Sequence, residues 1–186
     1  MKPIDKGKFT AAYESEYGRL KSDAKADLHI LLAFLSADEK ITDIRHAAYM
    51  LATAKHETGH TFSPIEEVGK GKGRTYGKKN PRTGVAYYGR GYVQLTHLDN
   101  YDFMGKVLGL DLVNHPALAL KYDVAYKIMS YGMRNGTFTG VKLGKYINDD
   151  RTDYVSARRI INGQDCAGRI SGYATAFERI LKGCTE

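Results

Sequence analysis

HETG at residues 56–59 and YYGRGYVQLTH at residues 87–97 frame the stretch that decides how this chain is interpreted. The residues before it form an apolar helical pattern, which Gly59 is suited to end and Pro64 prevents from resuming. Between the two motifs, residues 68–91 are rich in Gly and Lys. This segment therefore predicts a helix that ends at a polar motif and a long loop that follows it.

Apolar residues recur at helical spacing on both sides of this stretch. Asp43 is suited to cap the helix that runs into HETG. Strand signals are weak, because residues 85–93 alternate only loosely between polar and apolar. A chain of 186 residues without an obvious linker suits a single, mainly α-helical domain over residues 1–186. The spacing predicts helices over residues 24–37, 43–58, 98–109, 116–131, 151–162 and 168–182.

The formal net charge of +7 favours anionic partners such as nucleic acid, an anionic cell envelope or an acidic polymer. One dense basic run spans residues 70–79. The chain has neither zinc-finger spacing nor the aromatic pattern of RNA-binding modules, so nucleic acid is not expected as a partner. An anionic cell envelope fits the charge better, and a monomer is the default expectation.

The amino terminus lacks the apolar core and cleavage pattern of a signal peptide, which predicts synthesis in a cytoplasm. If the protein acts outside that compartment, something else must release it. Cys166 and Cys184 form neither a metal cluster nor a disulfide framework. Free thiols are the default, and a single bridge between the two cysteines is the alternative.

Three carboxylates in this stretch suit hydrolysis of a bond between sugars, which needs a proton donor and an ionised carboxylate in different environments. Glu57 extends an apolar helical face near a helix carboxyl end, a setting that favours the protonated acid. Glu67, or its neighbour Glu66, lies past Pro64 in a turn-rich segment and suits the base. The plain alternative is that all three are ordinary solvated carboxylates without a catalytic role.

Residues 56–60 also match H-E-x-x-H, the signature of zinc peptidases. That reading requires the helix to continue through His60, so that His56 and His60 share one helical face. Gly59 inside the motif and Pro64 after it both oppose such a helix. The spacing therefore disfavours a zinc site, and no metal ligand or cofactor is expected.

Several motifs, in this order, resemble glycoside hydrolase family 19, which holds chitinases and phage or bacterial peptidoglycan hydrolases. They are HETG, SPIEE (63–67), YYGRGYVQLTHLDNY (87–101), HPALAL (115–120), ING (161–163) and RISGY (169–173). The resemblance runs from about residue 45 to residue 180. It implies a mainly α, lysozyme-like helical fold with a substrate cleft between two lobes.

The resemblance also implies an inverting mechanism, in which one carboxylic acid protonates the leaving oxygen and one carboxylate activates water. Glu57 matches the acid, Glu67 the base with Glu66 as the alternative, and Thr96 a position that helps to hold the water. The other matched positions imply contacts with sugar, and the last of them orients the base. They are Gln94, Asn100, Asn162, Tyr87, Tyr88 and Arg169.

Two departures from the chitinases of this family bear on the substrate. The chain cannot form the several disulfides of plant chitinases, and the loops that lengthen the chitin cleft look absent. The resemblance then favours an endolysin that cuts the β-1,4 bonds of peptidoglycan without a cofactor and reaches the wall after release, assisted by a holin. A chitinase, a zinc peptidase and a non-enzymatic envelope-binding module are the alternatives, in that order.

Overall fold

The computed structural model describes residues 2–185, which fall into two compact units. The terminal unit holds residues 2–62 and 130–185, and the central unit holds residues 63–129. Helix α5 (Tyr122–Asn135) begins in the central unit and ends in the terminal unit.

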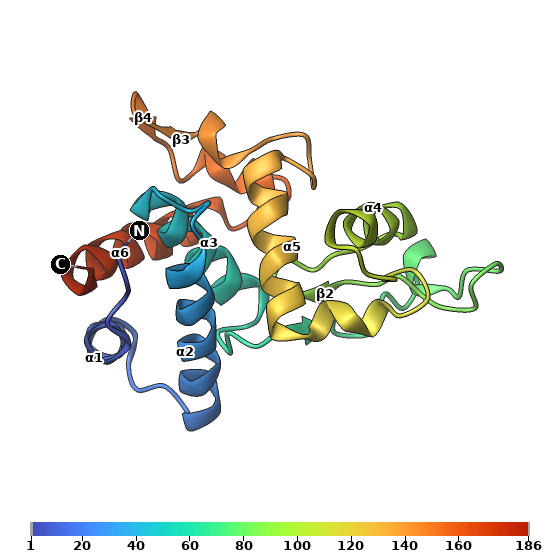
Figure 1. The fold of residues 1–186 in the computed structure, drawn as a ribbon, viewed down its shortest axis with the longest axis horizontal. Helices are drawn as coiled ribbons and strands as arrows, with labels where there is room; N and C mark the ends of the chain where they lie inside the picture. Colours follow the sequence, from blue (N-terminus) through green and yellow to red (C-terminus); the bar gives the residue numbers. More distant parts are fainter. Residues whose placement is uncertain (1, 186) are drawn as a thin grey trace. The chain divides into compact units, whose positions relative to one another are not determined.

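The terminal unit is a helical assembly built around α3 (Ile44–Glu57), in which every residue from Ala47 to Lys55 is buried. Helix α6 (Ala167–Cys184) packs along α3 and also against α1 (Lys6–Tyr17), as Figure 1 shows. Helix α2 (Ser22–Ala37) buries its leucine stripe, as its apolar spacing predicts. Aromatic rings fill the α1–α6 interface, where Tyr13 and Phe177 stack at 6.0 Å.

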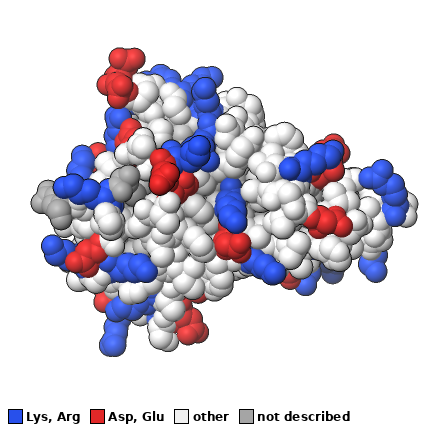
Figure 2. Space-filling view, viewed as in Figure 1, with Lys and Arg blue, Asp and Glu red and all other residues white. Residues whose placement is uncertain are grey.

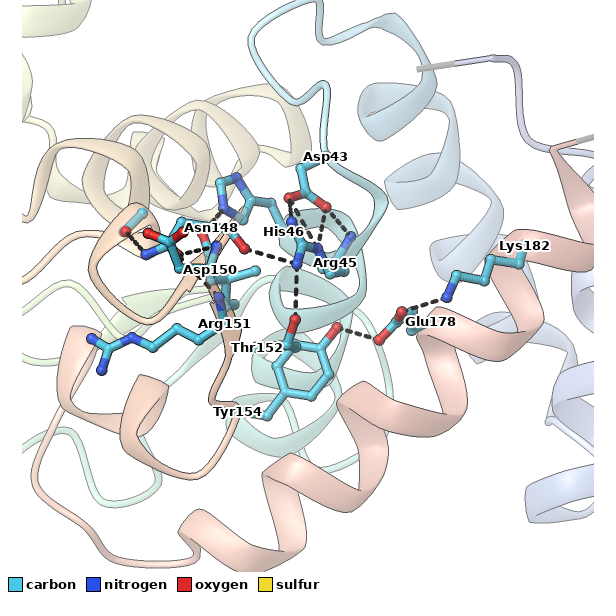
Figure 3. Close-up of polar contacts among 12 residues, drawn as sticks. Asp43, Arg45, His46, Asn148, Asp150, Arg151, Thr152, Tyr154, Glu178 and Lys182 are labelled. Atoms are coloured by element: carbon cyan, nitrogen blue, oxygen red, sulfur yellow. Dashed lines mark hydrogen bonds and ion pairs between the residues drawn. The ribbon is translucent and has the colours of Figure 1, made fainter.

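A short hairpin is fastened to the start of α3 (Figure 3). Strands β3 (Ile147–Asn148) and β4 (Arg151–Thr152) pair antiparallel. Arg45 donates to the Asn148 carbonyl and to the Thr152 hydroxyl, both at 2.9 Å. Asp43 accepts from the Arg45 backbone amide at 2.8 Å, so it caps α3 as predicted. The same cap thus holds the arginine that anchors the hairpin.

The central unit has little regular structure apart from α4 (Leu98–Leu108) and the first part of α5. Strands β1 (Ile65–Glu66) and β2 (Arg90–Gly91) pair antiparallel, with Glu66 opposite Arg90. Gly91 has φ +84°, and a Cβ at this position would lie 2.9 Å from the Ala119 carbonyl oxygen. The second glycine of the GRG motif is therefore required for the close approach of β2 to the 3₁₀ helix η2 (Pro116–Leu120). The short helix η1 (Thr75–Gly77) lies in the basic loop.

Two predicted helices need correction, and one further helix was not expected. The helix predicted over 116–131 is divided, because Lys121 is extended (ψ 135°) between η2 and α5. The helix predicted over 151–162 is only the 3₁₀ helix η4 (Ser156–Ile160), since residues 151–152 belong to β4. Helix α1 was not expected, because its apolar residues form no clear stripe. The 3₁₀ helix η3 (Leu143–Lys145) precedes β3.

The remaining predicted helices agree with the structure, including α4, which ends at Gly109 in the left-handed conformation. Both cysteines are free, Cys166 at the surface and Cys184 buried. On the face shown in Figure 2, Lys and Arg side chains are interspersed with Asp and Glu. None of the described helices combines the length and the apolar character that crossing a membrane requires.

Candidate active site

The HETG motif forms the end of helix α3. Gly59 adopts φ +59°, its amide donates to the His56 carbonyl, and the His60 amide donates to the Lys55 carbonyl at 2.8 Å. These two bonds make a Schellman motif, which satisfies the last carbonyls of a helix. The Thr58 hydroxyl accepts from the Phe62 amide at 3.0 Å and so fixes the reversal of the chain. The motif therefore places Glu57 at the last helical residue.

The zinc-peptidase alternative fails on this geometry. Helix α3 ends at Glu57, and His60 lies beyond it with φ +71°, so His56 and His60 do not share a helical face. His60 instead lies against Tyr173, with its Nε2 3.3 Å from the tyrosine hydroxyl. Among residues 2–185, no cluster of three or more His, Cys, Asp or Glu side chains is arranged to hold a metal ion.

Glu57 is held by an arginine that the sequence analysis did not single out. Nη1 of Arg158, in η4, donates to Oε1 of Glu57 at 2.6 Å. The Glu57 side chain is 16% exposed and that of Arg158 only 2%. The expected apolar setting of Glu57 is therefore wrong in one respect, because a buried guanidinium fixes one carboxylate oxygen. An ion pair of this kind orients the carboxyl group through Oε1 and does not engage Oε2.

Arg158 is itself fixed at both ends of its guanidinium. Its Nε donates to the Asp165 carbonyl at 3.1 Å, and Nη2 donates to the Asp165 carboxylate at 3.3 Å. Burial lowers the pKa of Arg158, but its hydrogen bond and ion pair with Glu57, aided by Asp165, raise it overall above the ordinary value. The segment before ING therefore forms a rigid support for the end of α3.

Glu66 is surrounded by cations and a hydroxyl in the central unit. Lys70 Nζ lies 2.8 Å from Oε2, and Arg90 Nε lies 3.7 Å from Oε1, which also accepts from the Tyr88 hydroxyl. The hydrogen bonds from Lys70 and Tyr88 lower the pKa of Glu66 below its ordinary value. Arg90 is 5% exposed and also donates to Tyr101 at 3.0 Å. Glu66 therefore belongs to a local ion-pair network.

Glu67 has neutral partners instead. Its Oε1 accepts from the Tyr76 hydroxyl and its Oε2 from the Gly89 amide, both at 3.0 Å. The Glu67 amide in turn donates to the Gly89 carbonyl at 2.7 Å. Two neutral donors orient the carboxylate without neutralising its charge, which is what activation of a water molecule requires. The contacts of the central unit therefore suit Glu67 better than Glu66 for the base.

The polar residues of the YYGRGYVQLTH segment and the turn after it are fixed by backbone contacts. Gln94, at φ +53°, donates to the Ile65 and Gly91 carbonyls, and a Cβ on Gly89 would lie 2.8 Å from its Oε1. The Thr96 hydroxyl donates to the Gln94 carbonyl at 2.8 Å. Asn100 donates to the Thr96 carbonyl at 2.8 Å. These bonds bring Gln94, Thr96 and Asn100 together, and they leave the hydroxyl oxygen of Thr96 able to accept a further bond.

Tyr87 and Tyr88 are 3% and 9% exposed. The Tyr87 hydroxyl donates to the Val113 carbonyl at 2.9 Å and accepts from the Thr83 hydroxyl at 2.7 Å. Tyr88 donates to Glu66. Both tyrosines therefore stabilise the loop rather than present an exposed ring to a ligand. Tyr87 also lines a cavity of about 470 Å³ together with Tyr76 and His97.

Asn162 and Arg169, the last two predicted site residues, lie in the terminal unit and are exposed. The Asn162 side chain accepts from the Gly163 amide at 2.9 Å. Arg169 lies in the first turn of α6, where it was expected to orient the base. Arg169 was predicted from its motif, whereas the arginine that contacts Glu57 is Arg158. The paired basic residues 158–159 just before ING were the only signal that could have pointed to it.

Comparisons with known proteins identify the family of the chain. Residues 11–133 match glycoside hydrolase family 19, described as chitinase class I. The chain is 33% identical over 144 residues to the basic endochitinase CHB4 of Brassica napus. This alignment covers 74% of this chain and 50% of the Brassica protein. This chain is also 33% identical over 176 residues to chitinase 3 of Oryza sativa subsp. japonica, and the alignment covers 82% of this chain and 50% of the rice protein. The chain thus spans about half the length of these relatives.

The fold is also similar to that of a solved structure. Chitinase C from Streptomyces griseus HUT6037 aligns with a TM-score of 0.64 and 25% identity, covering 98% of this chain and 78% of that one. The predicted fold class, a mainly helical lysozyme-like fold, is confirmed. The match of the family to two thirds of the sequence shows that this chain belongs to glycoside hydrolase family 19.

Proposed function

We propose that this protein hydrolyses β-1,4 bonds between N-acetylated amino sugars by an inverting mechanism with two carboxylates. The observation that carries the proposal is the support of Glu57, which ends α3 in a helix-terminating motif and has one oxygen fixed by a buried arginine. A general acid needs such positioning, because proton transfer depends on its distance from the leaving oxygen. The membership in family 19 supports the same chemistry.

In this mechanism Glu57 donates a proton from Oε2 to the glycosidic oxygen, while Arg158 holds Oε1 in place. Glu67 accepts a proton from a water molecule, and the oxygen of that water attacks the anomeric carbon from the opposite face. Thr96 has a hydroxyl that is already oriented and can accept from the same water. Inversion requires a separation of roughly 6.5–9.5 Å between the two carboxyl groups during the reaction.

Chitin is the polymer that the names of the relatives support, since they are an endochitinase and chitinases. The glycan of the bacterial wall is a second candidate, because it shares β-1,4-linked N-acetylated sugars. A specific observation favours it: the chain carries a net charge of +7, and residues 70–82 hold six Lys and Arg but no Asp or Glu. Chitin is neutral, whereas an anionic wall attracts such a surface, an attraction that salt weakens.

The test compares Glu57→Gln with Glu39→Gln, a change of the same kind at an exposed glutamate. Both variants and the parent protein are incubated with chitin oligosaccharides and with purified cell wall, and new reducing ends are counted. We expect Glu57→Gln to lower kcat by roughly 10²–10⁴ with unchanged circular dichroism, and Glu39→Gln to behave as the parent. Retained activity in Glu57→Gln would remove this residue from the mechanism. The substrate that is turned over, and the sugar at its new reducing end, name the polymer and the bond.

A further inference from the structure

A buried lysine lies two residues before Glu57. Lys55 is in the last turn of α3 and is 2% exposed. Its ammonium lies over the rings of Tyr17, Tyr13 and Tyr173, at 4.2, 4.6 and 5.2 Å from their centroids. The ammonium also donates a hydrogen bond to the Tyr13 hydroxyl. Three helices, α1, α3 and α6, therefore contribute to an aromatic cage around one cation.

This cation has no counter-charge within the described chain. Among residues 2–185, no Asp or Glu forms an ion pair with Lys55, and the glutamates of α1 are engaged elsewhere. Glu14 lies 3.7 Å from Lys25, and Glu16 lies 2.5 Å from Arg179. Burial lowers the pKa of Lys55 to about 8. Aromatic rings attract a cation, but they supply no negative charge and accept only weakly from its remaining hydrogens.

The cage opens into a cavity of about 280 Å³ in the terminal unit. Its walls include the rings of Tyr13 and Tyr17, and its rim includes the exposed cations Arg19 and Lys21. His60 also borders it. No acidic residue is among the side chains that line the cavity. The cavity therefore combines a buried positive charge, a positive rim and an aromatic wall.

We propose that this cavity binds an acidic amino sugar, with its carboxylate toward Lys55 and its ring against Tyr17. A carboxylate supplies the missing counter-charge and accepts the ammonium hydrogens that Tyr13 does not take. An aromatic face suits the apolar face of a sugar ring, which a small inorganic anion lacks. The volume lies just below the usual range of small-molecule sites, roughly 300–1,000 Å³, and so suits a single sugar unit.

The inference rests on the proposed function with the glycan of the bacterial cell wall as the substrate. The wall glycan contains N-acetylmuramic acid, which differs from N-acetylglucosamine by a lactyl group that ends in a carboxylate. Chitin contains no acidic sugar. A cavity that accepts only the acidic sugar would therefore add a second contact with wall glycan, apart from the carboxylates that cleave it.

The test is a binding experiment that does not depend on hydrolysis. The side-chain resonances of ¹³C-lysine-labelled protein are followed by NMR during titration with N-acetylmuramic acid, N-acetylglucosamine or inorganic phosphate. We expect N-acetylmuramic acid to shift the Lys55 resonance and to move its titration midpoint upward from about 8, because a bound anion favours the ammonium. We expect roughly tenfold weaker binding, or none, with the neutral sugar and with phosphate. Equal binding of the neutral sugar or of phosphate would overturn the proposal.

Variants distinguish binding in the cavity from non-specific attraction of an anion to the positively charged protein. Lys55→Met keeps the length and apolar stem of the side chain, and Lys40→Met removes the same charge from an exposed site in the same unit. We expect only Lys55→Met to abolish binding of N-acetylmuramic acid. Arg19→Gln changes the rim without touching the core and should weaken binding several-fold, so the proposal remains testable if Lys55→Met does not fold. Unchanged binding in both Lys55→Met and Arg19→Gln would overturn it.

The same variants distinguish failure of this inference from failure of the proposed function. Hydrolysis of chitin oligosaccharides by Lys55→Met should equal that of the parent protein, because Lys55 has no part in the chemistry. If the parent cleaves wall glycan but N-acetylmuramic acid does not shift the Lys55 resonance, only the cavity proposal is wrong. If the parent binds N-acetylmuramic acid but cleaves neither polymer, the cavity proposal holds and the proposed function is wrong.

Discussion

Nη1 of Arg158 lies 2.6 Å from Oε1 of Glu57, although the two residues are 101 positions apart in the sequence. One residue ends α3 and the other lies in η4, so the contact joins two segments that meet only in the folded terminal unit. Because the guanidinium is buried, it holds the carboxyl group in a single orientation. This relationship makes Arg158 a positioning residue for the candidate acid.

Replacing Arg158 by Lys should lower kcat far more than it changes KM. A lysine keeps the charge but cannot contact Glu57 and Asp165 at once, so the acid loses its orientation. We expect a fall of roughly 10- to 100-fold in kcat on chitin oligosaccharides or cell wall, measured by steady-state kinetics. Arg159→Lys, at the exposed neighbouring position, is the matched control and should retain full activity. A loss of equal size in both variants would argue against a specific role for Arg158.

Substitution of Glu66 and of Glu67 should have different effects, because we propose a structural role for Glu66 and a catalytic one for Glu67. Glu67→Gln removes the anion that activates water, so kcat should fall by roughly 10²–10⁴ with little change in stability. Glu66→Gln instead weakens the network around the buried Arg90, which should cost about 1 kcal/mol of unfolding free energy and less than tenfold in kcat. Thermal unfolding and kinetics of the two variants measure both quantities.

Azide provides an independent check on that assignment. A small anion can attack in place of the activated water when the base is missing, and it should restore turnover in Glu67→Gln with inverted configuration at the anomeric carbon. It should not restore turnover in Glu57→Gln, which lacks the proton donor. Rescue of Glu66→Gln rather than Glu67→Gln would assign the base to Glu66.

The sequence predicted those parts of the structure that depend on local spacing. Helices α2, α3, α4 and α6 follow apolar stripes, and Asp43, Gly59 and Gly109 act at their ends as their side chains and backbone freedom predict. The chain from 151 to 162 was mispredicted because helical spacing in a short segment does not reveal that its first residues pair in a hairpin. Helix α1 was missed because its side of the core is aromatic rather than a leucine stripe.

The residues of the candidate site were likewise predicted only in part from the sequence. The motifs predicted Glu57, Glu67 and Thr96 as the reactive groups, and these assignments stay predictions until the variants are measured. Arg158 and Tyr76 were missed, because each meets its carboxylate only through folding. Nothing in the pattern around Lys55 distinguished a buried cation from an ordinary surface lysine, since the rings that enclose it come from α1 and α6.

Gly59→Ala should destabilise the protein by about 1 kcal/mol, because φ +59° is unfavourable for a residue with a Cβ. Gly172→Ala is the matched control. This glycine lies inside α6 with no atom within 4 Å of an added Cβ, so the change should be neutral or slightly stabilising. Chemical denaturation measures both variants. If Gly59→Ala unfolds at the same denaturant concentration as the parent, the helix end does not depend on the left-handed glycine.

The contribution of Lys55 to the stability of the protein should rise with pH between about 8 and 10. Burial lowers the pKa of this lysine from 10.5 to about 8 in the folded protein. Between these values the unfolded chain binds a proton that the folded protein has released, so the contribution of Lys55 to the free energy of unfolding increases with pH, by about 2 kcal/mol up to pH 10. Tyrosines act in the opposite direction from about pH 9, because they begin to ionise in the unfolded chain while burial raises the pKa of several of them in the folded protein, Tyr13 and Tyr17 among them. Urea unfolding at a series of pH values should show that the stability of the parent relative to Lys55→Met increases by about 2 kcal/mol from pH 8 to pH 10. The stability of the parent relative to Lys40→Met should stay constant, because the tyrosines are common to all three proteins. An identical slope in all three proteins would mean that the ammonium is solvated in the folded state.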